Sequence, residues 1–216
     1  MHIFVAHDFS KPPLRNYRRP FQTVGDKYSV AFIFGDDVRL AENLLEQIEA
    51  MIAKSDACLF DVSSWNHNVF LELGFARGLR KDCYLLFRPA VGLLWRLGMS
   101  DGHIDVPADI RGLRQLRYWR ERTLRLQLDD LVKDLVFRAD LSAMQDMLAA
   151  RIEDLLSRHD GGLLIGQIAN EFRLDQALVS GVLRILVAQR RVATDGNTSG
   201  TRYLKLAGPM DGVKAA

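Results

Sequence analysis

The chain has 216 residues, of which 48% are hydrophobic and 26% are charged, the balance of a globular protein with enough apolar material for its own core. The 29 lysines and arginines against 27 aspartates and glutamates give a formal net charge of +2, so the overall charge does not indicate a polyanionic partner. The two cysteines, Cys58 and Cys83, lie in apolar runs that indicate buried thiols, and the absence of a signal-peptide pattern or a long apolar stretch predicts a cytoplasmic protein that does not enter a membrane.

The first part of the chain alternates apolar strands with amphipathic helices. Strands are predicted at residues 3–6, 28–34, 57–62, 83–87 and 113–119, and helices at 39–53, 68–79 and 123–136, with a long loop at 91–109. Pro12, Pro13 and Pro20 limit any helix in the basic stretch around Tyr17 to a short one. This rhythm predicts an α/β domain over residues 1–138, with a parallel, flavodoxin-like sheet covered by helices on both faces.

The last part of the chain has a different pattern. A helix is predicted at 144–156, followed by the stop at Asp160-Gly161-Gly162, a helix at 165–172 and a longer helix at 175–189 that Asp175 caps. Two short strands at 192–194 and 202–206 flank a glycine-rich tip, as in a hairpin. This order of elements is typical of a small winged helix-turn-helix domain, which we expect at residues 142–207.

The segment Asp61 to Gly78 carries the strongest candidate for chemistry. It leads from a strand end through two asparagines into a helix, and ligands of open α/β sheets bind at the carboxyl ends of the strands. If the helix begins near Asn68, then Val69, Leu73 and Ala76 face the sheet, and Glu72 lies at the edge of that apolar face beside the crevice.

A carboxylate at that position suits the cleavage of an N-glycosidic bond. Breaking the bond between C1′ of the sugar and the base passes through an oxocarbenium-like sugar, which a nearby carboxylate stabilises or attacks. Asp61, Ser63, Asn66 and Asn68 are candidates for holding the ribose hydroxyls. Trp65 is a candidate for stacking against a base, because aromatic planes suit nucleobases.

Structural explanations of the same residues stay open at this point. A glutamate in the first turn of a helix is favoured by the helix dipole without any function. Asn68 is also explained as a helix cap, and Gly74 and Gly78 as close-packing positions. His7 and Asp8 suit an acid/base pair, a binding role or a plain loop, and as neighbours along a strand only one of them reaches a given face.

Several other classes of site lose their main support. There is no Gly-x-Gly-x-x-Gly after the first strand, no Walker loop and no Gly-x-Ser-x-Gly, which argues against dehydrogenases, nucleoside triphosphatases and α/β-hydrolases. The histidines have no metal-ligand spacing with the two cysteines, so neither a metal nor another cofactor is expected.

Two segments resemble a known group of enzymes. Asp61 to Gly78 resembles the signature of the nucleoside 2-deoxyribosyltransferase-like families, in which an acidic strand end leads to an Asn-x-Asn-Val-x-x-Glu-Leu-Gly helix, although His67 stands where those families often have proline. The related TIR-like NAD hydrolases also place a glutamate on the helix after this strand. The segment Phe4 to Ser10 resembles the first strand and the nucleotide-facing loop of both groups.

This resemblance implies roles for individual residues. Glu72 would be the catalytic carboxylate, and Asp61 would be a second acidic group that orients the sugar together with Asn68. The loop from the first strand would form part of the substrate pocket through His7, Asp8, Phe9 and Ser10.

Basic residues outside this motif are candidates for phosphate contact. Arg15, Arg18 and Arg19 suit a phosphate or pyrophosphate, and equally a solvated loop. In the second domain the candidates for nucleic-acid contact are Gln176, Ser180, Arg184, Arg190, Arg191 and Arg202. Seven basic against four acidic residues between Arg158 and Lys205 give that part +3, and docking of a protein partner is the alternative.

The sequence as a whole therefore predicts an N-glycosidase. Its substrate would be a nucleotide, with NAD as one candidate, and the reaction would be hydrolysis or transfer without a cofactor. A catalytic domain joined to a winged helix resembles toxin-like effectors of bacterial antiphage defence, including those paired with retrons, and we expect a homo-oligomer. The alternatives are a non-catalytic, nucleotide-sensing regulator whose winged helix binds DNA, and an adaptor that makes only protein contacts.

Overall fold

The computed structural model describes residues 1–37, 44–89, 110, 112–196 and 200–206. The chain divides into two compact units, Met1–Val136 and Phe137–Ala216, which we call unit 1 and unit 2. Among the described residues, no helix combines the length and the apolar character that crossing a bilayer requires.

Unit 1 is built on a five-stranded parallel sheet. Its strands are β1 (His2–Ala6), β2 (Ala31–Phe34), β3 (Ala57–Asp61), β4 (Asp82–Phe87) and β5 (Gln115–Arg117), in the spatial order β2-β1-β3-β4-β5. That order is the one of flavodoxin-like doubly wound sheets. The predicted parallel α/β sheet is thus confirmed, and the central strands are continuous apolar runs because they are buried on both faces.

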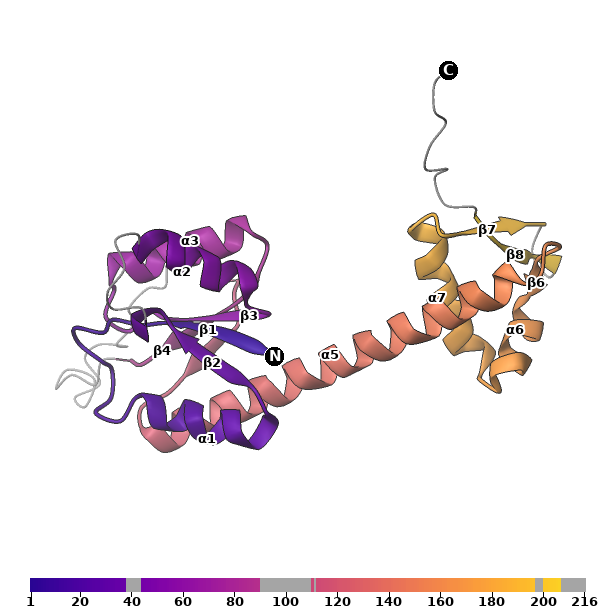
Figure 1. The fold of residues 1–216 in the computed structure, drawn as a ribbon. Helices are drawn as coiled ribbons and strands as arrows, with labels where there is room; N and C mark the ends of the chain where they lie inside the picture. The colour runs from indigo at the N-terminus through magenta and orange to yellow at the C-terminus, as the bar shows by residue number, and fades with distance from the viewer. Residues whose placement is uncertain (38–43, 90–109, 111, 197–199, 207–216) are drawn as a thin grey trace, which may run out of the picture. The chain divides into compact units, whose positions relative to one another are not determined.

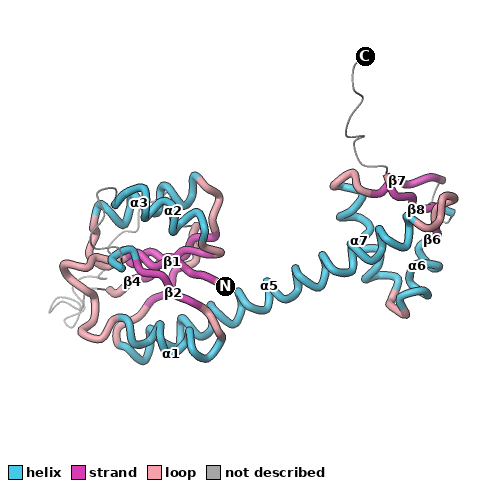
Figure 2. Tube along the Cα trace, in the orientation of Figure 1, coloured by secondary structure: helices cyan, strands magenta, loops and turns pink. Residues whose placement is uncertain are grey.

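Helices cover both faces of this sheet, as Figures 1 and 2 show. The elements are α1 (Arg18–Tyr28), the short 3-10 helix η1 (Gly35–Asp37), α2 (Leu44–Lys54), α3 (His67–Gly78) and the first part of α5 (Glu121–Ser157). Strand residues alternate between two cores: Val5 and Leu59 pack with α1 and α5, whereas Phe4 and Phe60 pack with α2 and α3. Val69, Leu73 and Ala76 are buried against the sheet as predicted.

The predicted strand at 28–34 begins three residues too early. Tyr28 is the last residue of α1, and Ser29 closes the helix in the left-handed conformation with φ 54°. The backbone N–H of Val30 then donates to the carbonyl of Gly25 at 3.0 Å, so β2 starts only at Ala31. The start of the helix predicted at 39–53 and the loop predicted at 91–109 lie outside the described residues.

The two helices predicted at 123–136 and 144–156 are one continuous helix, α5. The prediction of a break was wrong because the intervening segment, Phe137 to Ala143, contains neither glycine nor proline and offers no helix stop. The helix ends at Ser157, shortly before the predicted stop at Gly161 and Gly162, where Gly162 has φ 65°.

Unit 2 contains the rest of α5, the helices α6 (Ile165–Phe172) and α7 (Gln176–Ala188), and an antiparallel sheet of β6 (Leu163–Leu164), β8 (Arg202–Lys205) and β7 (Val192–Asp195). The side chain of Asp175 caps α7 by accepting from the N–H of Ala177 at 2.6 Å, as predicted. The core of unit 2 contains Ile152, Ile168, Leu183 and Val192, which come from α5, α6, α7 and β7. The short strand β6 was not predicted, because two residues give no periodicity.

Two helical glycines of unit 1 provide a matched stability test. A Cβ added at Gly25 would lie 2.7 Å from the carbonyl oxygen of Val30, whereas a Cβ at Gly74 would meet no atom of the described residues within 4 Å. We expect Gly25→Ala to destabilise the protein, because the clash costs about 1–3 kcal/mol and exceeds the gain in helix propensity of about 1 kcal/mol. Gly74→Ala should keep that gain and stabilise the protein.

Urea denaturation midpoints of the two variants against the native chain test this pair. Equal effects of both substitutions would contradict the close approach of α1 to β2. Among the described residues no atom lies within 4 Å of a Cβ at Gly74 or at Gly78, so close packing against these residues does not explain the two glycines.

Candidate functional site

A cavity of about 400 Å³ opens at the carboxyl ends of β1 and β2, beside the first turns of α3. We call it the Glu72 cavity. It is lined by Ala6, His7, Phe9, Gly35, Asp36, Leu44, Ile48, Asn66, Asn68, Val69 and Glu72. The predicted residues His7, Phe9, Asn66, Asn68 and Glu72 are therefore brought together here.

The start of α3 decides which side chains reach the cavity. Asn66 is the cap, and its side-chain oxygen accepts from the N–H of Asn68 at 2.9 Å. The alternative in which Asn68 only caps the helix is therefore wrong. Because α3 begins at His67, Glu72 lies beyond the first turn, where the helix dipole has little effect. The dipole consequently does not account for Glu72.

Glu72 is a half-buried carboxylate without a charge partner. No hydrogen bond or ion pair joins its side chain to any residue that the structure describes. Burial raises the pKa of Glu72 from 4.5 to about 7, because the ionised form loses hydration and gains nothing in return. A carboxyl group of this kind exchanges its proton near neutral pH, which is typical of catalytic acids and bases.

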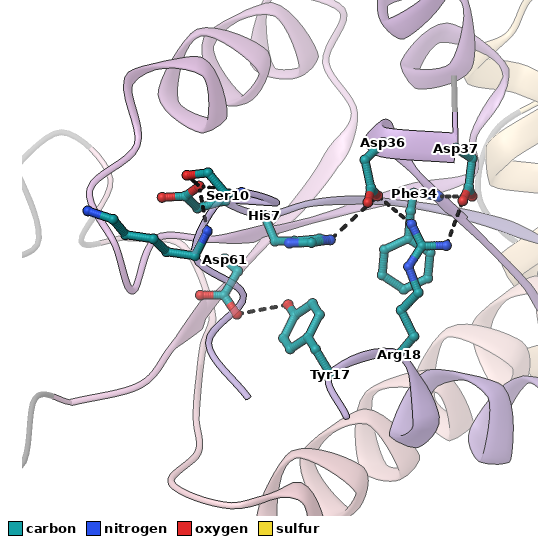
Figure 3. Close-up of polar contacts among 10 residues, drawn as sticks. His7, Ser10, Tyr17, Arg18, Phe34, Asp36, Asp37 and Asp61 are labelled. Atoms are coloured by element: carbon teal, nitrogen blue, oxygen red, sulfur yellow. Dashed lines mark hydrogen bonds and ion pairs between the residues drawn. The ribbon is translucent and has the colours of Figure 1, made fainter. Parts of the chain in front are cut away.

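His7 is the second unusual side chain of the cavity. Its side chain is only 6% exposed, and within the described chain neither ring nitrogen has a hydrogen-bond partner. The nearest acidic atom is Oδ1 of Asp36, 3.5 Å from Nε2, and the Tyr17 ring lies 4.8 Å from the imidazole centre (Figure 3). Buried polar atoms are normally hydrogen-bonded, so both ring nitrogens are free to bond a water molecule or a ligand.

Asp8 and Ser10, which were predicted to bind substrate, hydrogen-bond each other and stabilise the loop after β1. Oδ1 of Asp8 accepts from Oγ of Ser10 at 2.6 Å and from the N–H groups of Ser10 and Lys11. The hydrogen bond from Ser10 is the main cause that lowers the pKa of Asp8. Neither residue lines the Glu72 cavity, so of the neighbouring pair His7 and Asp8 it is His7 that reaches it.

Asp61 lies outside the Glu72 cavity. It is 1% exposed and accepts hydrogen bonds from the hydroxyl groups of Tyr17, at 2.8 Å, and of Tyr118 (Figure 3 shows the Tyr17 bond). Both tyrosines belong to the core on the α1 and α5 side, whereas Glu72 projects from α3 on the other face. Burial raises the pKa of Asp61, although these hydrogen bonds and those from Ser63 act in the opposite direction.

Ser63 and Trp65 also have structural partners. Ser63 donates to Asp61 through both its N–H and its hydroxyl, and its Oγ accepts from the N–H of Arg88 at 2.8 Å. Trp65 adopts φ 55° and packs against Phe70, with ring centres 5.4 Å apart. Neither side chain is among those that line the Glu72 cavity.

Sequence reasoning missed Asp36 as a site residue. Asp36 had no role in the sequence-based prediction, but β2 neighbours β1 in the sheet, so the end of β2 lies beside His7. The guanidinium of Arg18 bonds both Asp36 and Asp37, the latter at 2.6 Å (Figure 3). An acidic pair at the end of a predicted parallel strand was the available signal.

The residues predicted to contact nucleic acid are spread over unit 2. Gln176, Arg184 and Arg190 are exposed, and Ser180 is half-buried. Arg191 forms a two-bond ion pair with Glu153, at 2.6 and 2.8 Å. Arg202 donates to the carbonyl groups of Gly161 and Gly162. The exposed side of α7 also carries two apolar side chains, Leu178 and Ile185.

Within the described residues, no group of three His, Cys, Asp or Glu side chains could hold a metal ion. Cys58 and Cys83 are buried, unpaired thiols as predicted, and they are neighbours in the register of β3 and β4. Burial raises the pKa of Cys58 to about 12 and that of Cys83 to about 11, so both stay protonated and unreactive.

No protein-family model matches this chain, and no curated protein sequence matches it either.

The raised pKa of Glu72 predicts a pH-dependent stability difference. A carboxyl group whose pKa rises on folding contributes stability that is complete below pH 4.5 and is lost as the pH rises to about 7. Glu72→Gln lacks the charged form, so above pH 7 we expect it to be more stable than the native chain by about 1–3 kcal/mol, a difference that shrinks towards pH 4.5.

Thermal melting of both proteins between pH 4.5 and 8 measures this difference. Glu171→Gln, at an exposed position of α6, controls for the loss of one negative charge. If the difference in melting temperature between Glu72→Gln and the native chain stays constant across this range, burial does not raise the pKa of Glu72.

Proposed function

We propose that unit 1 is an N-glycosidase that cleaves the bond between C1′ of a nucleotide and its base, with Glu72 as the catalytic carboxylate. The observation that carries the proposal is the half-buried Glu72, which has no partner among the described residues, in a cavity also lined by Asn66, Asn68 and His7. The motif resemblance of Asp61 to Gly78 points to the same chemistry.

The reaction follows from the charge on Glu72. As the C1′–N bond breaks, the electron pair leaves with the base, and positive charge develops on the sugar. The ionised Glu72 stabilises that charge or bonds to C1′. Water then bonds to C1′ through its oxygen, breaking the bond to Glu72 where one has formed, and gives up a proton that the carboxylate accepts. The proton passes on to a base that leaves as an anion, or to solvent where the base leaves neutral, as nicotinamide leaves NAD. In a transfer reaction a ring nitrogen of a second base takes the place of water.

The neighbouring side chains supply binding. Asn66 and Asn68 present amide groups to the same cavity and suit the sugar hydroxyls, and the exposed ring of Phe9 offers a surface on which a base can stack. Asp61 was predicted as a second acidic site residue. In this proposal it does not contact the substrate but fixes the end of β3 through its hydrogen bonds from Tyr17 and Tyr118.

Unit 2 is the accessory part of this proposal. Its helices α6 and α7 followed by the antiparallel pair β7 and β8 support a winged-helix module. Its control of a toxin-like effector of antiphage defence is proposed from the resemblance in domain organisation. The exposed Leu178 and Ile185 on α7, together with the ion pair that occupies Arg191, favour a protein partner over DNA. That observation also weighs against the DNA-binding regulator.

Base release tests the proposed reaction. Purified protein incubated with NAD, nucleotides and deoxynucleotides should release free base, detected by chromatography, and Glu72→Gln should lower the rate by about 10²–10³-fold. Because the ionised carboxylate acts, the rate should rise with pH as Glu72 loses its proton around pH 7. Glu171→Gln, at an exposed position of α6 that does not line the Glu72 cavity, should retain the native rate.

Unchanged base release by Glu72→Gln, with a native thermal melt, would remove Glu72 from the mechanism. Absence of any base release, together with sequence-specific DNA binding by the full chain, would favour the regulator.

A further inference from the structure

A second cavity adjoins the Glu72 cavity on the other side of His7. Its volume is about 680 Å³, and its walls come from the loop after β1, the start of α1 and the end of β2. His7, Phe9 and Asp36 line both cavities. The remaining lining includes Arg15, Arg18 and Arg19, and we call this space the arginine cavity.

The charges of the arginine cavity favour an anion. Arg15 is exposed, and no acidic side chain of the described chain pairs with it. Arg19 is 71% exposed, with only a 3.5 Å contact to Glu121. Arg18 bonds to both Asp36 and Asp37 and so offsets part of the negative charge in the shared wall, while Arg15 and Arg19 supply the positive charge that faces a ligand.

The start of α1 adds to this preference. The helix begins at Arg18, has no acidic residue in its first turn, and receives no side-chain hydrogen bond from its cap residue, Tyr17. The positive end of the helix dipole is therefore not neutralised within α1, and it lies beside the residues that line the arginine cavity.

His7 connects the two cavities. Its imidazole is more than nine-tenths buried and held between the rings of Tyr17 and Phe34, so it cannot turn freely to find water. Both ring nitrogens lack a hydrogen-bond partner in the described part of the chain. A ligand that passes from one cavity to the other would provide that partner, and the sugar-phosphate portion of a nucleotide has the hydroxyl and phosphate oxygens to do so.

We propose that the arginine cavity binds the phosphate of the substrate whose glycosidic bond lies at Glu72, so that the protein selects nucleotides over uncharged nucleosides. Arg15 and Arg19 contact the phosphate, and His7 bonds the sugar-phosphate link between the two cavities. This inference rests on the proposed function, because it places the scissile bond at Glu72. It assigns the substrate class: a nucleoside 5′-phosphate or a dinucleotide joined through phosphates.

Binding to the full-length Glu72→Gln protein tests the inference without turnover. Isothermal titration with the four ribonucleoside 5′-monophosphates, NAD, the parent nucleosides and inorganic phosphate should show at least one phosphorylated ligand that binds about 10-fold or more tightly than its nucleoside. The Arg15→Gln, Arg19→Gln double variant should abolish that preference while nucleoside binding stays the same. Added salt should weaken nucleotide binding only.

Arg125→Gln, an exposed arginine of α5 outside both cavities, is the matched control and should keep the preference. The inference is overturned if nucleotide and nucleoside bind equally, if none of the probes binds, if inorganic phosphate alone binds as tightly as the nucleotide, or if the double variant retains the preference.

The outcomes separate this inference from the proposed function. If nucleotides bind through the two arginines but the native protein releases no base, the phosphate site is supported and the enzymatic function is contradicted. If the protein releases base from nucleosides as fast as from nucleotides, the enzymatic function is supported and the phosphate site is contradicted.

Discussion

The hydrogen bonds to the buried carboxylate of Asp61 are the interactions on which the candidate site of unit 1 depends. It accepts hydrogen bonds from Tyr17 at the start of α1, from Tyr118 after β5 and from Ser63 after β3, and so joins three segments that are far apart in the sequence. Burial and the nearby Asp61 raise the pKa of both tyrosines, so their hydroxyls stay protonated and keep donating. Losing one partner from such a network leaves buried polar groups unpaired, which is why its members act together.

The two cavities follow from this fixed arrangement. Tyr17 is bonded to Asp61 through its hydroxyl while its ring lies against His7, so the imidazole is held in the wall between the Glu72 cavity and the arginine cavity. On the opposite side of that wall, Arg18 holds Asp36 in place and lies 4.2 Å from the centre of the Phe34 ring. The polar groups of the wall are thus positioned by the fold before any ligand binds, which lowers the cost of binding one.

The sequence was sufficient for the features that depend on local pattern. Apolar runs located the five strands, and the spacing of Val69, Leu73 and Ala76 placed Glu72 beside the crevice. It was not sufficient for side chains whose partners are distant. Asp61 looked like a second site residue because nothing nearby shows that Tyr17 and Tyr118, 44 and 57 residues away, occupy its oxygens. The lack of a hydrogen-bond partner at His7 is likewise a property of the assembled fold.

Asp61, the last residue of β3, and Glu72, on the helix that follows, show how the surroundings of two carboxyl groups give them different roles. Both are buried enough for the pKa to rise, but Asp61 is surrounded by donors and Glu72 has none in the described chain. Hydrogen bonds commit the oxygens of Asp61 to the fold, so they cannot bond a substrate without breaking the network. Glu72 keeps all its acceptor capacity and is ionised and protonated in comparable amounts near pH 7. Within the described residues the Glu72 carboxyl has no partner at the carboxyl edge of the parallel sheet, an arrangement that is typical of carboxyl groups at functional sites.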